Sequence, residues 1–395
     1  MGLLDFFYKP KEQRSASNFT LGAIGGSSSG VRVSEDNSIG LPAVWAAVRL
    51  LSETIASLPL NVYRKDKDGS KYVDEKIPLN KLLSTSPNTK YTSFINTMMN
   101  SLLLWGNAYC LIIRNGGSRP IALEILQPDK VEVAVGDDGE TYYKVKDLGT
   151  FSSMEILHIV GLSFNGLVGK SPIQACKEAV GFGLATQQYG SNFFQGANLS
   201  GVLEHPGVLT DEAANRLRTS WANRYSGLAN SHSTAVLENG TKFKPIAMPL
   251  ADSAFIESRN FSVAEIARIF RLAPHLIGDL SRSTYSNIEQ QSLEFAKYTL
   301  TPYLINWEQE LNRKLLSTKE QGTHFCKFRT NELLRGDVNS RADYYTKLFN
   351  VGALSPNDIR SMEDMNKVNN GDEYYVPLNL GEVGRTNNDN ENQNG

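Results

Sequence analysis

The residues whose types and spacing come nearest to a catalytic motif are Gly169, Lys170 and Ser171. A phosphate-binding P-loop places its first glycine five positions before this Gly-Lys-Ser triplet, so that backbone N–H groups can cradle the phosphates. Phe164 occupies that position, and no strong apolar strand leads directly into the segment. Ser171 followed by Pro172 is instead typical of a helix start, with Gln174 where a capping box places its second partner. The sequence therefore favours helix capping over nucleotide binding.

The other residue types that could do chemistry are scattered. The five histidines are His158, His205, His232, His275 and His324, and none has the spacing of a metal-binding motif. His324 and Cys326 lie two apart on a predicted strand, which puts them on one face, but core packing explains such a pair better than zinc. No nucleophile elbow occurs, and Glu363 and Asp364 are expected to be solvated. We therefore expect no enzyme activity, no cofactor and no metal.

Composition and charge limit the class of protein. A chain of 395 residues favours two or three domains. The 40 Lys and Arg face 42 Asp and Glu, a net charge of -2, which argues against tight or sequence-specific DNA binding. The three cysteines are far apart and odd in number, as expected for a reducing compartment. With no long apolar run and no basic leader, the sequence predicts a cytosolic origin and no membrane association.

The N-terminal half alternates helical and strand-like patterns. Residues 11 to 39 are rich in Gly and Ser and predict a mobile arm. A helix starts near Pro42 and ends at Pro59, with an apolar stripe formed by Val44, Val48, Leu51, Ile55 and Leu58. A hairpin turning at Asp68-Gly69, a helix from Thr92 to Trp105 and a small meandering sheet from Asn107 to Val145 follow. This portion is predicted to be an α+β domain.

The second half is mainly helical. Helices are predicted from Ser171 to Phe194, although Gly181 and Gly183 weaken the first, and from Ser253 to Arg271. Between them lies a compact insert with a strand, a helix begun by Thr210, and a strand pair turning at Asn239-Gly240. The longest helix should run from Asn287 to about Leu316 and bend at Pro302. The strand-like HFCKFR, a helix from Asp337 to Asn350, a capped helix begun by Ser355 and a disordered tail complete the chain.

Two surface features remain. Arg216, Arg218 and Arg224 are expected to form a basic face on the helix of the insert, either a solvated face or a surface on which a partner docks. The segment LAPHLIGDLSRSTYSNIEQQ, residues 272 to 291, places small polar residues around a single Arg282 between two predicted helices.

The order of several short motifs resembles the portal protein family of tailed double-stranded DNA bacteriophages, of the siphovirus head type. These motifs are WAAVRLLSETIASLPLNVYR, GNAY, GKSPI, FFQGA, RNFSVAEIARIFRLAPHLIGD, YSNIEQ, LTPYLINWEQELNRKL, NDIR and GDEYYVPLN. The resemblance covers about residues 40 to 380. Small departures occur: LAP stands where the family commonly has a Val-Pro-Pro-like turn, and NDIR replaces Asn-Glu-Ile-Arg.

The resemblance implies a mainly helical multi-domain portal fold that assembles as a ring, with twelve subunits in the virion. The implied division is a flexible N-terminal arm (1–39), an α+β wing (40–170 and 318–335), stem helices (171–198 and 250–272), a clip (199–249), a tunnel loop (273–287), a long kinked helix (288–317), a helical crown (336–380) and a disordered tail (381–395). It also implies a location at one capsid vertex, after assembly in the host cytoplasm.

The implied function is a channel for DNA packaging and ejection. The implied partners are the large subunit of the terminase motor, a head-tail adaptor, and the major capsid and scaffolding proteins, with Arg216, Arg218 and Arg224 in the clip as docking candidates. Twelve copies of a strongly basic loop would hold DNA still. We therefore expect a weakly charged tunnel loop to line the narrowest part, formed by Asp279, Ser281, Arg282, Ser283, Thr284, Tyr285 and Ser286. A buried inter-helix turn without DNA contact is the competing interpretation. Another head-tail connector or capsid component, or a DNA-processing packaging enzyme, is the alternative function.

Overall fold

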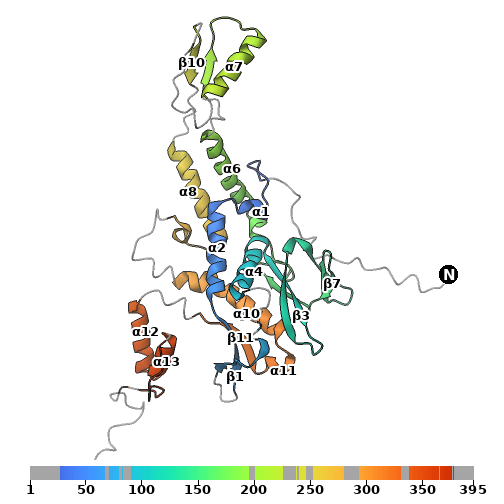
Figure 1. Cartoon of the computed structure of the whole chain (residues 1–395), viewed down its shortest axis with the longest axis vertical. Coiled ribbons are helices and arrows are strands. Elements are labelled where there is room, and N and C mark those ends of the chain that lie inside the picture. The colour runs from blue at the N-terminus through green and yellow to red at the C-terminus, as the bar shows by residue number, and fades with distance from the viewer. Residues whose placement is uncertain are drawn as a thin grey trace, which may run out of the picture. The chain divides into compact units, whose positions relative to one another are not determined.

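In the computed structural model, the described residues are 27–66, 71–79, 82, 90–194, 201–225, 237, 240–245, 252–279, 293–330, 338–363, 365–375 and 377. The chain divides into two compact units, Met1–Arg329 and Thr330–Gly395. Helices and strands alternate along the first unit, whereas the second is helical, so the predicted α+β class is confirmed (Figure 1).

Two helices, α2 (Pro42–Ser57) and α4 (Tyr91–Trp105), pack side by side in the first unit (Figure 1). The predicted apolar stripe of α2 is confirmed, because its residues are buried: Val44, Val48, Leu51, Ile55 and, at the C-cap, Leu58. The Tyr91 hydroxyl donates to the Leu58 carbonyl at 2.6 Å and fixes the start of α4 against the end of α2. Gly106, at φ 74°, then ends α4.

Three of the antiparallel sheets in the described part of the first unit have three strands each. In the first, β1 (Leu60–Lys65) lies between β2 (Lys71–Val73) and β11 (His324–Phe328), so the late strand returns to the N-terminal portion as predicted. The turn predicted at Asp68-Gly69 lies outside the described residues.

The single meandering sheet predicted for residues 107 to 145 is wrong, because two three-stranded sheets form. Their orders are β4-β3-β8 and β5-β6-β7. Their strands are β3 (Asn107–Arg114), β4 (Pro120–Leu126), β5 (Val131–Val135), β6 (Thr141–Val145), β7 (Gly149–Ser152) and β8 (Ile156–Val160). Strand β8, ILHIV, was missed because four of its five residues are apolar and four are buried, so it shows no alternating pattern.

The helix predicted from Ser171 is divided at Cys176 into α5 (Pro172–Ala175) and α6 (Lys177–Phe194). Ser171 Oγ accepts from the Gln174 N–H at 3.2 Å, which confirms the cap. The other half of the predicted capping box is wrong, since the Gln174 side chain donates to Glu35 Oε2 at 3.2 Å.

Helix α6 packs against α8 (Asp252–Ile269), as Figure 1 shows. A Cβ at Gly183 would lie 2.7 Å from Ser262 Oγ, and a Cβ at Gly190 would lie 2.8 Å from Phe255 Cζ. The glycines that lower the helix propensity of α6 therefore allow α8 to approach closely.

The residues just before α2 are ordered. Helix α1 (Glu35–Ser38) carries a capping box between Ser34 and Asn37, and the Ser28 N–H donates to Glu178 Oε2 on α6 at 2.8 Å. The predicted mobile arm is therefore wrong for residues 27–39, because hydrogen bonds tie this segment to α6. Its remainder lies outside the described residues.

The long helix is irregular where proline requires it. A short 3-10 turn, η4 (Pro274–Ile277), follows α8, and later a π-helical segment, η6 (Phe295–Leu300), leads directly into α10 (Thr301–Leu315). Pro302 has no N–H and clashes with a regular preceding turn, so the wider π turn accommodates it. The helix continues past Pro302 as predicted, and a π segment lies directly before the position where a bend was predicted. The predicted start at Asn287 lies outside the described residues.

The second unit contains α12 (Val338–Asn350) and α13 (Pro356–Met362), close to the predicted ranges, and Ser355 caps α13. The buried Asn357 side chain accepts from the Val368 N–H at 2.9 Å and donates to the Val368 carbonyl at 3.0 Å. Glu363 is not simply solvated, because it pairs with Arg341 at 3.4 Å and accepts from the Tyr345 hydroxyl at 2.6 Å. Asp364 lies outside the described residues.

A close backbone approach joins α5 and α6 to the sheet β4-β3-β8. The Gly161 N–H donates to the Gly106 carbonyl at 2.8 Å, and a Cβ at Gly169 would fall well inside the van der Waals radius of that same oxygen. The Asn107 side chain accepts from the Gly169 N–H at 2.7 Å and donates to the Gly169 carbonyl at 2.8 Å. The glycine that resembled part of a P-loop thus belongs to a backbone junction, and β8 leads into it.

His158 completes this junction from β8. Its Nε2 lies 3.1 Å from Asn107 Oδ1, and its Nδ1 lies 3.2 Å from the Tyr143 hydroxyl. Because Asn107 Oδ1 can only accept, Nε2 carries the proton and Nδ1 accepts from Tyr143. Burial, together with the positive charges of Lys314 and Arg313, lowers the pKa of His158 to about 3. The imidazole is therefore neutral in the folded protein.

Replacing Gly169 with alanine should destabilise the first unit by more than about 3 kcal/mol, because neither backbone segment at the junction can move aside. Urea unfolding measures the change. Gly116→Ala is the matched control, since a Cβ there meets nothing within 4 Å. Equal stability of the two variants would contradict the junction.

Stability should fall with acidification through His158. Below its ordinary pKa of 6.5 the unfolded chain binds a proton at this residue, whereas the folded chain does not until about pH 3. The free energy of unfolding therefore falls between these values, by about 2 kcal/mol from pH 7 to pH 5. His158→Gln should show a correspondingly shallower pH dependence in urea unfolding. An identical pH dependence in both proteins would rule out a neutral, buried imidazole.

Candidate docking and channel surfaces

A hydrogen bond joins two residues that flank the segment containing the predicted tunnel loop. After α8, Arg271 adopts a left-handed conformation, φ 54°, and its carbonyl accepts from the Thr299 hydroxyl at 2.6 Å. Thr299 belongs to η6, so this hydrogen bond holds Arg271, which follows α8, next to η6. Neither Arg271 nor Thr299 stood out in the sequence, because a left-handed arginine and a threonine hydroxyl have no local motif.

The loop itself is described only at its start. Pro274 and Gly278 bound the η4 turn, in which the Asp279 N–H donates to the Pro274 carbonyl at 3.1 Å. The other predicted loop residues lie outside the described residues: Ser281, Arg282, Ser283, Thr284, Tyr285 and Ser286.

The insert forms a small module of its own. Strands β9 (Gly201–Glu204) and β10 (Lys242–Pro245) pair antiparallel, and α7 (Asp211–Tyr225) packs on them through Trp221, whose ring stacks on Phe243 at 5.2 Å. The strand after Gly240 therefore pairs with β9. Apart from Leu237, the other strand of the predicted pair lies outside the described residues.

The predicted single basic face of α7 is wrong. Arg216 and Arg218 are both exposed, but at 3.6 residues per turn two positions two apart point about 200° from each other. Arg224 lies on the same helix, about 80° from Arg216, and its side chain is outside the described part. The module therefore presents basic side chains on more than one side.

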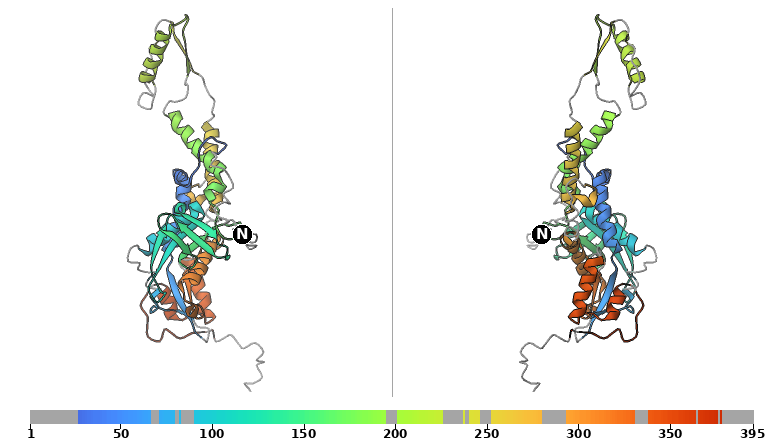
Figure 2. Two further views of the ribbon diagram at one scale, coloured as in Figure 1. Left: turned by 90° about the vertical axis from the view of Figure 1, so that its right-hand side faces the viewer. Right: turned by 90° about the vertical axis from the view of Figure 1, so that its left-hand side faces the viewer.

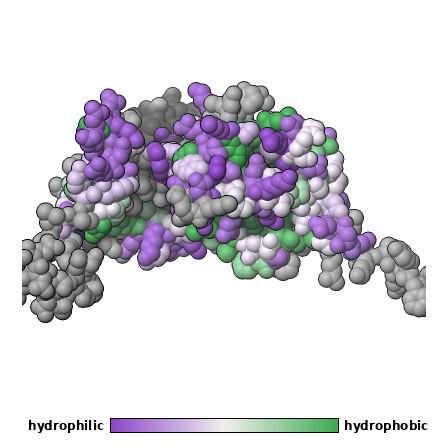
Figure 3. All heavy atoms as spheres, turned by 90° about the horizontal axis from the view of Figure 1, so that it is seen from below, coloured by the Kyte–Doolittle hydropathy of each residue, from purple (hydrophilic) through white to green (hydrophobic). Residues whose placement is uncertain are grey.

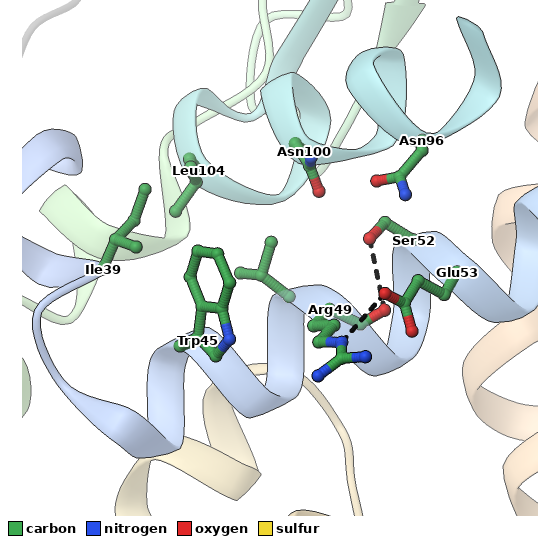
Figure 4. A pocket seen from close by; sticks show the side chains of 9 residues that line it. Ile39, Trp45, Arg49, Ser52, Glu53, Asn96, Asn100 and Leu104 are labelled. Atoms are coloured by element: carbon green, nitrogen blue, oxygen red, sulfur yellow. Dashed lines mark hydrogen bonds and ion pairs between the residues drawn. The ribbon is translucent and has the colours of Figure 1, made fainter. Parts of the chain in front are cut away.

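A groove opens between α2 and α4 (Figure 4). Its volume is about 230 Å³, and its walls come from two ridges with a spacing of four residues. The α2 ridge is Trp45, Arg49 and Glu53, and the α4 ridge is Asn96, Asn100 and Leu104, with Ile39, Val48 and Ser52 completing the lining. The Trp45 residue is 56% exposed.

Among the described residues, Cys110 and Cys326 are buried and His324 is paired with a carboxylate. Burial raises the pKa of the Cys326 thiol to about 12 and also raises that of Cys110, which keeps both thiols protonated. His324 Nε2 lies 3.2 Å from Asp74 Oδ2 and so forms a pair with a carboxylate, not with Cys326. Among the described residues, no group of three or more potential ligands could hold a metal ion.

The described helices include none with the length and hydropathy to cross a lipid bilayer. On the face shown in Figure 3, hydrophilic residues are spread among smaller apolar areas.

Comparison with known proteins gives consistent matches. The family model described as phage portal protein matches residues 42–364. The chain is 37% identical over 391 residues to a probable portal protein of Streptomyces phage phiC31, covering 94% of this chain and 85% of the relative.

Two solved structures share the fold. One is an HK97 family phage portal protein from Corynebacterium diphtheriae, with 16% identity, a TM-score of 0.59, and coverage of 79% of this chain and 99% of the other. The second is a chain in the neck of a native gene transfer agent particle computed with C12 symmetry, with 22% identity, a TM-score of 0.56, and coverage of 85% and 95%.

Proposed function

The chain belongs to the phage portal protein family, and we propose that twelve copies close into a ring around a channel for double-stranded DNA. As a portal protein it acts at a capsid vertex of the virion. The proposed ring assembles in the host cytoplasm, and DNA enters and leaves the capsid through it.

The observation that carries this proposal is the arrangement of α6 and α8. They pack against each other, while the module of β9, α7 and β10 is inserted between them in the sequence. We assign the α6/α8 pair to the stem and the inserted module to the clip. The sheets with α2 and α4 form the wing, residues 273–287 the tunnel loop, the helix that ends in α10 the long helix, and α12 with α13 the crown.

The tunnel loop suits DNA that must slide. One arginine per copy places a modest ring of positive charge on the channel axis, and a nearly balanced overall charge avoids a strong field along its length. The Thr299–Arg271 hydrogen bond joins the end of α8 to η6 on either side of the segment that contains the loop. Movement of the loop would then leave the surrounding helices in place.

The clip is the proposed docking site for the terminase large subunit and the head-tail adaptor. Its small size and its Trp221–Phe243 core allow α7 to present Arg216 and Arg218 in different directions. One side can then face a partner protein while the other faces a neighbouring copy or solvent. The wing is proposed to contact the major capsid and scaffolding proteins. We assign no catalytic role to the chain, so the motor supplies the work of translocation.

The purified protein should form rings that are visible by negative-stain electron microscopy, with a mass by light scattering of about twelve subunits. Recombinant rings of another subunit number would revise the stoichiometry but keep the channel. A protein that stays monomeric at all concentrations would contradict the proposed assembly.

Arg282→Ala should leave ring assembly intact and reduce DNA retention in filled particles several-fold, because each ring loses its axial arginines. Encapsidated DNA is measured after nuclease treatment of particles assembled with the variant. Arg119→Ala, at an exposed arginine in a wing turn, is the matched control. Unchanged retention in the Arg282 variant would identify the loop as a buried turn without DNA contact.

A further inference from the structure

The α2/α4 groove has a counterpart on the opposite side of the first unit. A closed ring is built from heterologous contacts, so each copy must present two different, complementary surfaces to its two neighbours. This inference rests on the proposed ring and identifies such a pair of surfaces.

The first surface is the groove (Figure 4). At 100° per residue, the mean direction of the α4 ridge, Asn96, Asn100 and Leu104, lies about 170° from the mean direction of Phe94 and Met99. The two asparagines are partly exposed, and Leu104 is buried. Trp45 remains 56% exposed at one end of the groove, where Leu104 provides an apolar wall. An exposed tryptophan beside a preformed depression is typical of the residues that dominate protein interfaces.

The second surface lies on α10. The inner side of this helix packs on β8 and β11 and contacts α4 through Trp307. The Trp307 indole N–H points to Met99 Sδ at 3.2 Å, and its ring meets Phe94 edge to face. The outer side carries Ile305, which is 47% exposed, then Gln309, and then Arg313, whose side chain is 66% exposed.

The two surfaces therefore lie on opposite sides of a layer made by α4 and α10. The groove is on the side of α4 away from α10, and Ile305, Gln309 and Arg313 are on the side of α10 away from α4. Figure 1 shows α4 and α10 as neighbouring elements of this unit. A head-to-tail contact between copies needs this opposition, because the same layer must be contacted from both sides.

The side chains of the α2 ridge and of the α10 stripe are complementary when the two helices are aligned. The ridge of α2 runs Trp45, Arg49, Glu53, and the stripe of α10 runs Ile305, Gln309, Arg313, both with four-residue spacing. Ridges of equal spacing can pack alongside each other. An apolar residue then faces Trp45, and Arg313 faces Glu53 with opposite charge. Glu53 is 53% exposed although it pairs with Arg49, and Arg313 is largely exposed although it pairs with Glu310, so each can reach a further partner.

We propose that in the ring the stripe of Ile305, Gln309 and Arg313 of one copy docks in the α2/α4 groove of the next copy. The Trp45 ring packs on Ile305, while Glu53 pairs with Arg313 across the boundary. The asparagine amides of α4 are placed to bond with Gln309.

Crosslinking with paired cysteines tests this contact. In a Cys176→Ser background, which removes the one natural cysteine that is not buried, Trp45→Cys and Ile305→Cys are combined in one chain. Treatment of assembled rings with a short bismaleimide should produce a ladder of covalent multimers on a denaturing gel. Each single-cysteine variant should remain monomeric, because only the double variant can link every copy to the next.

The outcomes separate this inference from the proposed function. Rings in the microscope without a ladder from the double variant would overturn the contact but leave the portal ring standing. Dimers from Trp45→Cys alone would also overturn it, because they require a two-fold contact of the groove with itself. The absence of rings from the unmodified protein would overturn both.

A second variant measures the contribution of the contact without crosslinking. Ile305→Asp should reduce the ring fraction at least about tenfold, as expected for a charge buried beside a central aromatic residue. Ile121→Asp, at a β4 residue that is 51% exposed, is the matched control and should assemble normally. Circular dichroism confirms that both variants are folded. Normal ring assembly by Ile305→Asp would contradict the proposal.

Discussion

The side-chain amide of Asn107 and the Gly169 backbone determine how the helical part of the first unit meets its sheets. Two hydrogen bonds join them, at 2.7 and 2.8 Å, and the absence of a Cβ at Gly169 lets the Gly106 carbonyl come close. These two bonds determine which atom of the Asn107 amide is the oxygen and which is the nitrogen. The oxygen can only accept a hydrogen bond from His158, so the proton of the imidazole lies on Nε2. A buried polar network is stabilising only when each member has a partner, and here the members specify one another.

Helices of the first unit have contacts or exposed surfaces on more than one side. Helix α10 uses its inner side to pack Trp307 against α4, and α4 uses its other side to form a wall of the groove beside α2. Close-packed side chains therefore connect the groove to α10 through α4. The π segment before Pro302 gives the long helix an irregular turn where it approaches the tunnel loop.

Much of the helical architecture could be predicted from the sequence, because it depends on local signals. The stripe of α2 and the caps at Ser171 and Ser355 follow from spacing and residue type. The family could be inferred from the order of motifs. Contacts between distant segments could not be predicted: His158 is one of five solitary histidines, and nothing local links it to Tyr143 or Asn107. The arginines of α7 illustrate a different error, since nearness in sequence does not place residues on one helix face.

The hydrogen bond between Thr299 and the Arg271 carbonyl brings together two points that are 28 residues apart. Because this hydrogen bond holds the two flanking residues together, the segment between them can change in length at little cost. The entropic cost of closing a loop grows only slowly with the number of residues in it. For the proposed ring, this means that relatives can differ in the width of the channel through changes in this segment alone. The helices on either side, α8 and α10, would keep their sequence and their positions while the width of the channel changes.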